Sequence, residues 1–191
     1  MEITSGRYKF DKYSKIINIL VKIFSVFGKQ FNYKLLCLFR NTWGSFGLLF
    51  RYIFLKNCAL KVGKNIGIKQ GVYFFNVNNL ILGDNVMINQ MSYVEAAGGI
   101  EIGNNVAIAH SCTLVSSDHS WDSKSTPIQY NKIKLSKIKI NDDVWIGCGV
   151  RVLGGANIGN RVVVAAGSVV NRNLDNFSLY AGVPCKKIKN I

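Results

Sequence analysis

The chain has 191 residues, 49% of them hydrophobic, and a formal net charge of +14. That length suits one domain with a real core, or one domain with an appendage, and the apolar content excludes an intrinsically disordered chain. The five cysteines have neither metal-site nor redox-pair spacing, so they indicate small buried hydrophobes in a reducing, cytoplasmic compartment.

The positive charge is concentrated near the N-terminus. Residues 1–61 hold 11 Lys and Arg against 2 Asp and Glu, whereas residues 62–191 hold 13 against 8. A strongly basic chain suits nucleic acid, but no aromatic–basic platform or recognised motif supports that interpretation here. We therefore expect no nucleic-acid partner.

The first predicted element is a basic amphipathic helix. From Tyr8 to Phe27 the apolar residues recur at helical spacing, and Lys15, Lys22 and Lys29 fall on a different stripe. This pattern is typical of a helix that buries one face or lies on a membrane surface.

The next segment, Leu35 to Leu55, is apolar for 21 residues but is interrupted by Arg40 and Arg51 and by two glycines. Two arginines and two glycines argue against a stable membrane helix. We expect residues 1–60 to form a helical segment with two roles left open. It either covers the open end of the fold that follows or holds the protein against an anionic membrane.

The dominant pattern of the chain is a six-residue period in its C-terminal half. Its aliphatic positions are Ile140, Ile146, Val152, Ile158, Val164 and Val170. Six helical steps rotate a side chain by about 600°, so this period builds no helix face. Because six is a multiple of two, it suits short strands joined by tight turns, and it is typical of a parallel β-helix of hexapeptide repeats.

The same pattern extends back to Val62, with two-residue slips before Leu82 and Ile102. It predicts a triangular prism of about five coils, in which each aliphatic residue points inward and stacks on its counterpart about eighteen residues later. An ordinary sandwich of short strands would show period two without period six. We therefore predict an all-β domain over residues 61–191, preceded by the α-helical segment 1–60.

The repeat breaks once, in a polar segment that we expect to be an inserted loop over residues 116–137. This loop carries His119, one of only two histidines in the chain. Loops on a rigid scaffold are frequent sites of function, and a histidine is suited to general-base chemistry because its unperturbed pKa is about 6.5. Zinc chemistry on such a prism would need three histidines, and only His110 and His119 are present, so we expect no metal.

At this point the chain resembles the left-handed β-helix acyltransferases, and among them the maltose/galactoside acetyltransferase-like sugar O-acetyltransferases of polysaccharide biosynthesis. The resemblance covers roughly residues 60–189. The motifs that carry it are Asp118-His119, Val144-Trp145-Ile146-Gly147, Ala166-Gly167-Ser168-Val169-Val170 and Ala181-Gly182-Val183-Pro184-Cys185-Lys186. The left-handed sense of the helix is implied by this resemblance alone, because the general crossover rule favours the opposite hand.

The resemblance implies direct acetyl transfer from acetyl-CoA to a sugar hydroxyl. His119 would act as the general base, and the backbone N–H of Cys148 would bind the oxyanion. The family often has serine at position 148, but a backbone amide is indifferent to that change. Asp118 and Asp122 are candidates to orient His119, and Asp118 is the poorer one.

The resemblance also implies substrate and coenzyme contacts. Asn89 and Trp145 match acceptor-side positions. Glu95 is a candidate to replace a family aspartate that would fall near Ala96-Ala97. The positions that match coenzyme A contacts are Ala166, Asn171, Arg172, Pro184, Lys186 and Lys189.

We therefore expect an acetyl-CoA-dependent O-acetyltransferase acting on a bacterial surface polysaccharide or its lipid-linked precursor. The resemblance implies a homotrimer with active sites between subunits, in the cytoplasm and in contact with the inner membrane face if residues 1–60 bind lipid. Two alternatives stay open: an N-acetyltransferase of a nucleotide-linked amino sugar, and a non-catalytic β-helix scaffold.

Overall fold

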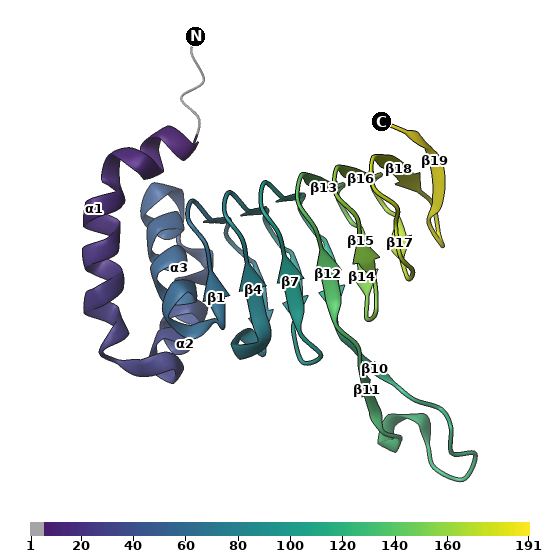
Figure 1. The fold of residues 1–191 in the computed structure, drawn as a ribbon. Helices are drawn as coiled ribbons and strands as arrows, with labels where there is room; N and C mark the ends of the chain where they lie inside the picture. Colours follow the sequence, from purple (N-terminus) through teal and green to yellow (C-terminus); the bar gives the residue numbers. More distant parts are fainter. Residues whose placement is uncertain (1–5) are drawn as a thin grey trace.

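The hexad repeats wind into a solenoid whose three faces are parallel sheets (Figure 1). The computed structural model describes residues 6–191, with side chains from residue 10 onward. Sheet A holds β1 (Lys61–Val62), β4 (Leu80–Leu82), β7 (Ile100–Ile102), β12 (Ile138–Ile140) and β15 (Asn157–Ile158). Sheet B holds β2 (Gly67–Ile68), β5 (Met87–Ile88), β8 (Ala107–Ile108), β13 (Val144–Ile146), β16 (Val162–Val164), β18 (Ser178–Ala181) and the antiparallel β19 (Lys186–Asn190). Sheet C holds β3 (Tyr73–Phe75), β6 (Tyr93–Glu95), β9 (Thr113–Val115), β14 (Arg151–Leu153) and β17 (Val169–Val170).

The core is the stack of repeating aliphatic residues. Ile140 pairs with Ile158 and Ile146 with Val164, each eighteen residues apart, and all four side chains are buried. Closing the strands into a helix removes most free sheet edges and encloses the aliphatic row on all three sides. The predicted β-helix of hexapeptide repeats is therefore confirmed.

The early coils are longer than the late ones. Val62 pairs with Leu82, and Leu82 with Ile102, each twenty residues apart. The two additional residues per coil lie at the corner between sheets C and A, where the turn η2 (Val77–Asn79) occupies the first coil. These corner residues account for the two-residue slips in the repeat.

The solenoid has about six turns, one more than the five expected from the sequence. The last turn bridges Leu174 to Ile158 and pairs Tyr180 with Val164, in both cases sixteen residues apart. Because this turn is two residues shorter than a coil of three hexads, the six-residue pattern does not reveal it.

Three helices and one short 3-10 turn lie against the β1 end of the solenoid (Figure 1). They are α1 (Gly6–Ser25), α2 (Gly28–Leu38), η1 (Phe39–Asn41) and α3 (Gly44–Cys58). Ile53, Phe54 and Leu55 of α3 are buried, and Ile17 of α1 packs into the same core. The apolar stretch 35–55 is thus divided between α2 and α3, and among residues 6–191 no helix has the length and apolarity needed to cross a membrane.

Arg51 joins the helical segment to the solenoid. Its side chain is buried, and its Nε donates to the carbonyl of Ile68 in β2. Its Nη1 donates to carbonyls of Phe39, Arg40 and Thr42 at the α2–α3 junction, with the shortest distance, 2.7 Å, to Thr42. Burial lowers the pKa of this guanidinium. The arginine that interrupts the apolar pattern therefore satisfies the carbonyls where α2 and η1 end.

The break in the repeat is a β-hairpin. It consists of β10 (Ser117–His119), the turn η3 (Ile128–Tyr130) and β11 (Ile133–Leu135), and it projects away from the solenoid (Figure 1). Because β9 of sheet C precedes it and β12 of sheet A follows it, the hairpin leaves the solenoid at the corner between these sheets.

Candidate active site

The neck of the hairpin is held between two glycines of neighbouring coils. Ser136 N donates to Ser116 O at 2.9 Å, which closes the neck. A Cβ added to Gly98 would lie 2.4 Å from Ser116 O, and one added to Gly154 would lie 3.2 Å from Ser136 O. Glycine at position 98 therefore allows the neck to approach the coil backbone at a distance no other residue permits.

Glu95 fastens the first strand of the hairpin to the second coil. Its Oε2 accepts from Ser117 Oγ at 2.9 Å and from Ser116 N at 3.3 Å. Its Oε1 accepts from Ala97 N at 2.7 Å. Both carboxylate oxygens of this half-buried residue are thus bonded within the chain, which favours a role in positioning the hairpin.

His119 lies at the end of β10, paired with Ile133 of β11, and its side chain is exposed. Asp118 Oδ1 accepts a hydrogen bond from His119 N at 2.9 Å, so this carboxylate faces the backbone. Among the described residues, no group forms a hydrogen bond with the His119 imidazole. Within the described part of one chain, neither Asp118 nor another group orients the ring.

Cys148 lies at a different corner of the prism. It follows β13 of sheet B and precedes β14 of sheet C. Within residues 10–191 its backbone N–H donates to no acceptor, whereas its carbonyl accepts from Gly167 N at 2.8 Å. The amide is therefore without an acceptor in this part of the chain, and one chain does not bring it to the corner that carries His119.

The two other acceptor-side candidates are also spread over the surface. Asn89 lies near the corner between sheets B and C, two coils before Gly147, and its Nδ2 donates to Ile108 O at 2.9 Å. Trp145 lies in β13, exposed, between Ala107 and Val163 of the neighbouring strands. In a single chain neither lies at the corner that carries the hairpin.

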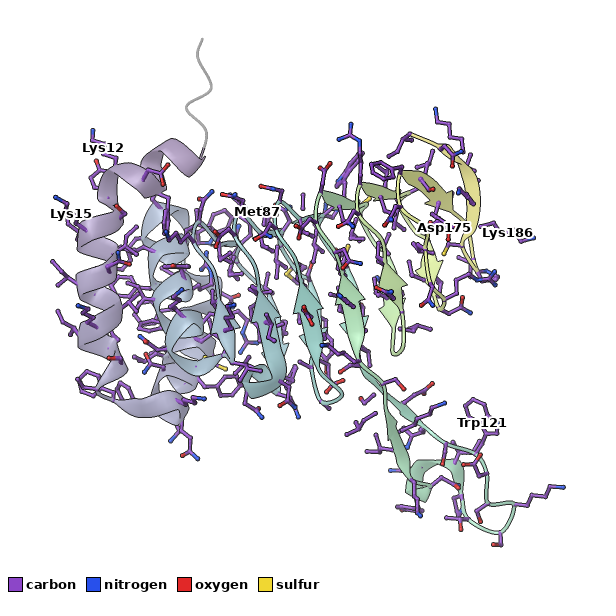
Figure 2. All side chains as sticks on the ribbon, viewed as in Figure 1. Lys12, Lys15, Met87, Trp121, Asp175 and Lys186 are labelled. Atoms are coloured by element: carbon purple, nitrogen blue, oxygen red, sulfur yellow. The ribbon has the colours of Figure 1, made fainter. Side chains whose placement is uncertain are left out.

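The candidate coenzyme contacts gather at the last coils. Ala166 follows Cys148 along the same corner, because Gly167 N bonds to Cys148 O. Pro184 lies in the loop between β18 and β19, where Cys185 N donates to Val169 O at 2.9 Å. Lys186 and Lys189 are exposed on β19, and Figure 2 shows Lys186 extending outward from this end of the solenoid.

The turn after β17 lies close to the same loop. Asn171 and Arg172 are exposed there. Burial raises the pKa of the Cys185 thiol, and the positive charge of Arg172 opposes that rise. Because Cys185 N is bonded to Val169 O in β17, Arg172, which follows β17 by two residues, lies near the loop that carries Pro184.

Sequence reasoning missed Arg151, which is next to the Cys148 corner. Its Nη1 donates to carbonyls of Ser111, at 2.8 Å, and of Gly149, at 2.9 Å. It lies one residue before the hexad position Val152, in no motif, so the sequence carried no signal for it.

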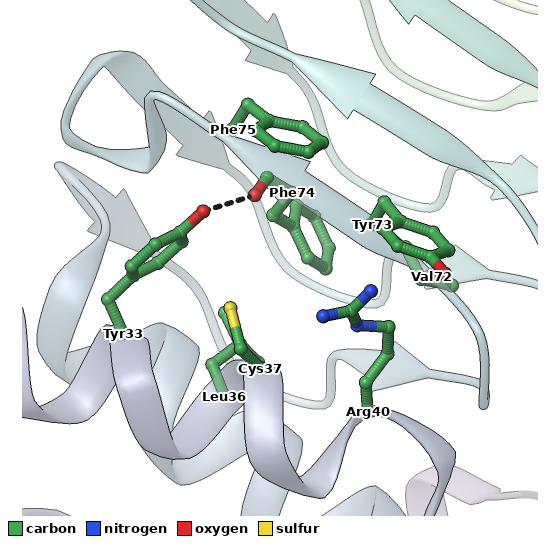
Figure 3. A pocket seen from close by; sticks show the side chains of 8 residues that line it. All are labelled: Tyr33, Leu36, Cys37, Arg40, Val72, Tyr73, Phe74 and Phe75. Atoms are coloured by element: carbon green, nitrogen blue, oxygen red, sulfur yellow. Dashed lines mark hydrogen bonds between the residues drawn. The ribbon is translucent and has the colours of Figure 1, made fainter.

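Two cavities lie far from this chemistry, against α2. The smaller, about 210 Å³, is drawn in Figure 3, where Tyr33 Oη donates to Phe74 O at 2.8 Å and Arg40 lies 3.9 Å from the centre of the Tyr73 ring. The larger, about 710 Å³, shares Tyr33 and Phe75 with it. Neither cavity is lined by His119 or Cys148.

Comparison with known proteins agrees with the predicted family. The family described as "Bacterial transferase hexapeptide (six repeats)" matches residues 137–172. The crystal structure of a maltose O-acetyltransferase from Clostridium difficile 630 is 31% identical, with a TM-score of 0.75 and coverage of 88% of both chains. The structure of a galactoside acetyltransferase in complex with coenzyme A is 28% identical, with a TM-score of 0.77, and the match covers 85% of this chain and 80% of that one.

Among curated proteins, the chain is 32% identical over 127 residues to the putative lipopolysaccharide biosynthesis O-acetyl transferase WbbJ of Escherichia coli (strain K12). That match covers 63% of this chain and 61% of WbbJ. Across three further curated relatives, the chain spans 37%, 57% and 66% of their length.

Proposed function

The chain belongs to the hexapeptide-repeat acetyltransferase family, and from that membership we propose that it is an acetyl-CoA-dependent O-acetyltransferase. Its acceptor is a sugar hydroxyl of a bacterial surface polysaccharide or of its lipid-linked precursor. The similarity to the putative lipopolysaccharide O-acetyl transferase supports this acceptor class.

In the proposed mechanism His119 removes the proton from the acceptor hydroxyl, and the oxygen attacks the thioester carbonyl of acetyl-CoA. The backbone N–H of Cys148 stabilises the negative charge that develops on that carbonyl oxygen. The C–S bond then breaks, the acetyl group stays on the sugar oxygen, and the leaving sulfur takes the proton from His119. The Cys148 thiol has no part in these steps.

The observation that carries this proposal is the placement of His119 on a hairpin that projects from the scaffold. Its neck is bonded to Glu95 and held beside Gly98, so the hairpin has a defined root. A rigid scaffold that presents a histidine on a projecting element is suited to acid–base chemistry on an external acceptor.

The separation of His119 from Cys148 supports an active site shared between chains. The two residues lie at different corners of one prism, so a site that uses both would take one of them from a second copy. The hairpin also exposes large apolar side chains that would pack against that copy. They are Trp121, Ile128, Tyr130, Ile133 and Leu135. We propose a homotrimer, in which every chain gives its hairpin to one neighbour.

Residues Ala166, Asn171, Arg172, Pro184, Lys186 and Lys189 fit coenzyme A. Small residues along the Cys148 corner leave space for the pantetheine arm. The cations Arg172, Lys186 and Lys189, all exposed at the last coils, suit its phosphates. Asn89 and Trp145 would contact the acceptor.

Calorimetric titration with acetyl-CoA tests this proposal, with Arg172→Glu/Lys186→Glu as the binding-deficient variant. We expect saturable binding near one per chain in the natural protein and weak binding in the variant. Absence of binding to a folded protein would reject the enzyme and favour a scaffold.

A transfer assay then identifies the acceptor. O-acetylation of lipid-linked glycans should be lost in His119→Ala, with coenzyme affinity unchanged. Transfer to a nucleotide-linked amino sugar instead would favour the N-acetyltransferase alternative.

A further inference from the structure

The helix α1 has two apolar faces, and only one of them is used by the fold. Ile17 and Phe24 face the core, and the Phe24 ring lies 5.1 Å from that of Phe54 in α3. Ile16, Ile19 and Ile23 point elsewhere, about a third of a turn around the helix from the buried stripe. These three side chains are 57%, 57% and 51% exposed. We call Ile16, Ile19 and Ile23 the outer face of α1.

The outer face continues beyond the end of α1. Val26 and Phe27 are exposed in the turn that follows, and the Phe27 ring lies 5.1 Å from that of Phe31 in α2. Single exposed apolar residues are ordinary on protein surfaces, whereas neighbouring ones that form a continuous row are typical of a surface that binds a partner or a membrane.

Lysines border the outer face. Lys12 and Lys15 each precede an outer-face isoleucine by four residues, Lys22 follows Ile19 by three, and all three are exposed. Figure 2 shows Lys12 and Lys15 extending from α1 away from the solenoid. Between residues 10 and 58, Asp11 is the single acidic residue. The surface around the outer face is therefore strongly positive.

From this arrangement we propose that the outer face of α1 docks on an anionic lipid bilayer, with the isoleucines inserted at the headgroup boundary and the lysines among the headgroups. Apolar residues bordered by lysines are typical of helices that lie in the membrane interface. None of the helices described has the length and apolarity to cross a membrane, so α1 would lie on the surface. A second copy fits the outer face less well, because two such faces would bring like charges together.

The proposal goes beyond acetyl transfer and does not depend on it. In this proposal α1 serves both roles that the sequence left open for the helical segment. The stripe with Ile17 and Phe24 covers the solenoid, and the outer face binds lipid. A lipid-linked acceptor would then be concentrated near the enzyme.

Cosedimentation of the full chain with vesicles tests the proposal. The two vesicle types are phosphatidylcholine with 30% phosphatidylglycerol and phosphatidylcholine alone. We expect binding to the anionic vesicles and at least tenfold weaker binding to the neutral ones. Equal binding to both, or no binding to either, would overturn the proposal.

Two variants and a control locate the surface. Ile19→Ser/Ile23→Ser should weaken binding about tenfold or more, since each isoleucine contributes by burial of apolar area. Lys15→Glu/Lys22→Glu should weaken binding to anionic vesicles by more than about twentyfold, because each lysine contributes about fivefold before its charge is reversed. The matched control Asn18→Ser/Ser25→Ala, on the polar side of α1, should bind as the natural protein does.

The substituted side chains are exposed, and the one hydrogen bond among them, from the Ser25 hydroxyl to Lys22 O, is exposed and local to the end of α1. Thermal unfolding should therefore change little in any of these variants. If instead the isoleucine variant bound vesicles normally and its oligomeric mass decreased in light scattering, the outer face would be a contact between copies and the proposal would be wrong.

Discussion

Glu95 Oε2 accepts a hydrogen bond of 2.9 Å from Ser117 Oγ, and this contact ties the second coil of the solenoid to the strand that carries His119. Ser117 and His119 are two residues apart on β10, so their side chains leave the same side of the strand. The position of the candidate base is therefore coupled to a carboxylate in sheet C.

Replacing Glu95 by Gln should lower kcat and leave the KM for acetyl-CoA unchanged. The Gln amide satisfies fewer of the three donors, so the hairpin root shifts, and displacement of a catalytic group by about 1 Å costs up to about 100-fold in rate. We expect a 10-fold to 100-fold loss of kcat. Steady-state kinetics with acetyl-CoA as the varied substrate measures both constants.

Ser117→Ala should produce a similar loss, and the double variant should lose little more than either single one, because the two residues act through one contact. Glu101→Gln is the control. Glu101 is bonded to Lys137, and that contact lowers the pKa of the Glu101 carboxyl. Its replacement should leave kcat unchanged, and additive losses at Glu95 and Ser117 would contradict the coupling.

Mixed oligomers should regain activity if the site is shared between chains. His119→Ala lacks the base, and Arg172→Glu/Lys186→Glu lacks coenzyme binding, so each is expected to be inactive alone. In a trimer that contains both variants, about a third of the sites would combine an intact His119 from one chain with an intact coenzyme site from another. Coexpression with two different tags, followed by activity measurement on doubly tagged protein, gives the result. Complete inactivity of the mixed oligomers would place the whole site in one chain.

Arg51→Met should destabilise the protein by about 3 kcal/mol or more. Methionine fills a similar volume but leaves the carbonyls of Ile68 and Thr42 without their donor, whereas those of Phe39 and Arg40 keep the backbone N–H groups of Thr42 and Gly71. Urea unfolding followed by circular dichroism measures the free energy of unfolding. Arg161→Met removes only the exposed ion pair with Asp143 and should change it by about 0.5 kcal/mol or less. A similar result for both variants would show that Arg51 does not hold the helices to the solenoid.

Stability should fall as the pH rises from about 9 toward 12. Burial raises the pKa of the Cys58 thiol to about 12 and that of Tyr52 to about 12, from ordinary values of 9.0 and 10.0. Above the ordinary values the unfolded chain releases these protons while the folded chain keeps them, so the unfolded state is favoured. Burial lowers the pKa of Lys56, which acts in the opposite direction.

The variant Tyr52→Phe/Cys58→Ala isolates the two groups. Its free energy of unfolding, measured in urea at pH 8 and at pH 10.5, should decline less between these values than that of the natural protein. An equal decline would mean that neither group is responsible for the alkaline loss.

Much of the fold follows from the sequence because a β-helix is built from a local repeat. The spacing of Ile140, Ile146 and Val152 states which side chains point inward without any knowledge of distant contacts, and the break after Leu114 marks the hairpin. The helix over residues 8–27 is visible for the same reason. The sixth turn was missed because Leu174 and Tyr180 keep the stacking but lose the spacing.

The sequence predicted the residues of the candidate site but not their relative positions. The resemblance selected His119 and Cys148 as residues, and nothing in their spacing said that they lie at different corners of the prism. That depends on which sheet precedes each turn, and therefore on the register of the whole solenoid.

The sequence by itself determined the repeating core, the interruption that carries His119 and the amphipathic character of α1, since each is a pattern within a few neighbouring residues. Tertiary structure decided the carbonyl partners of Arg51, the bond between Glu95 and Ser117, and which isoleucines of α1 stay exposed. The contacts of Arg51 and Glu95 join residues between 9 and 22 positions apart. The exposure of the isoleucines depends on which of the two apolar faces of α1 packs against the rest of the fold. No local pattern encodes that choice, because it is made by the packing of one element against another.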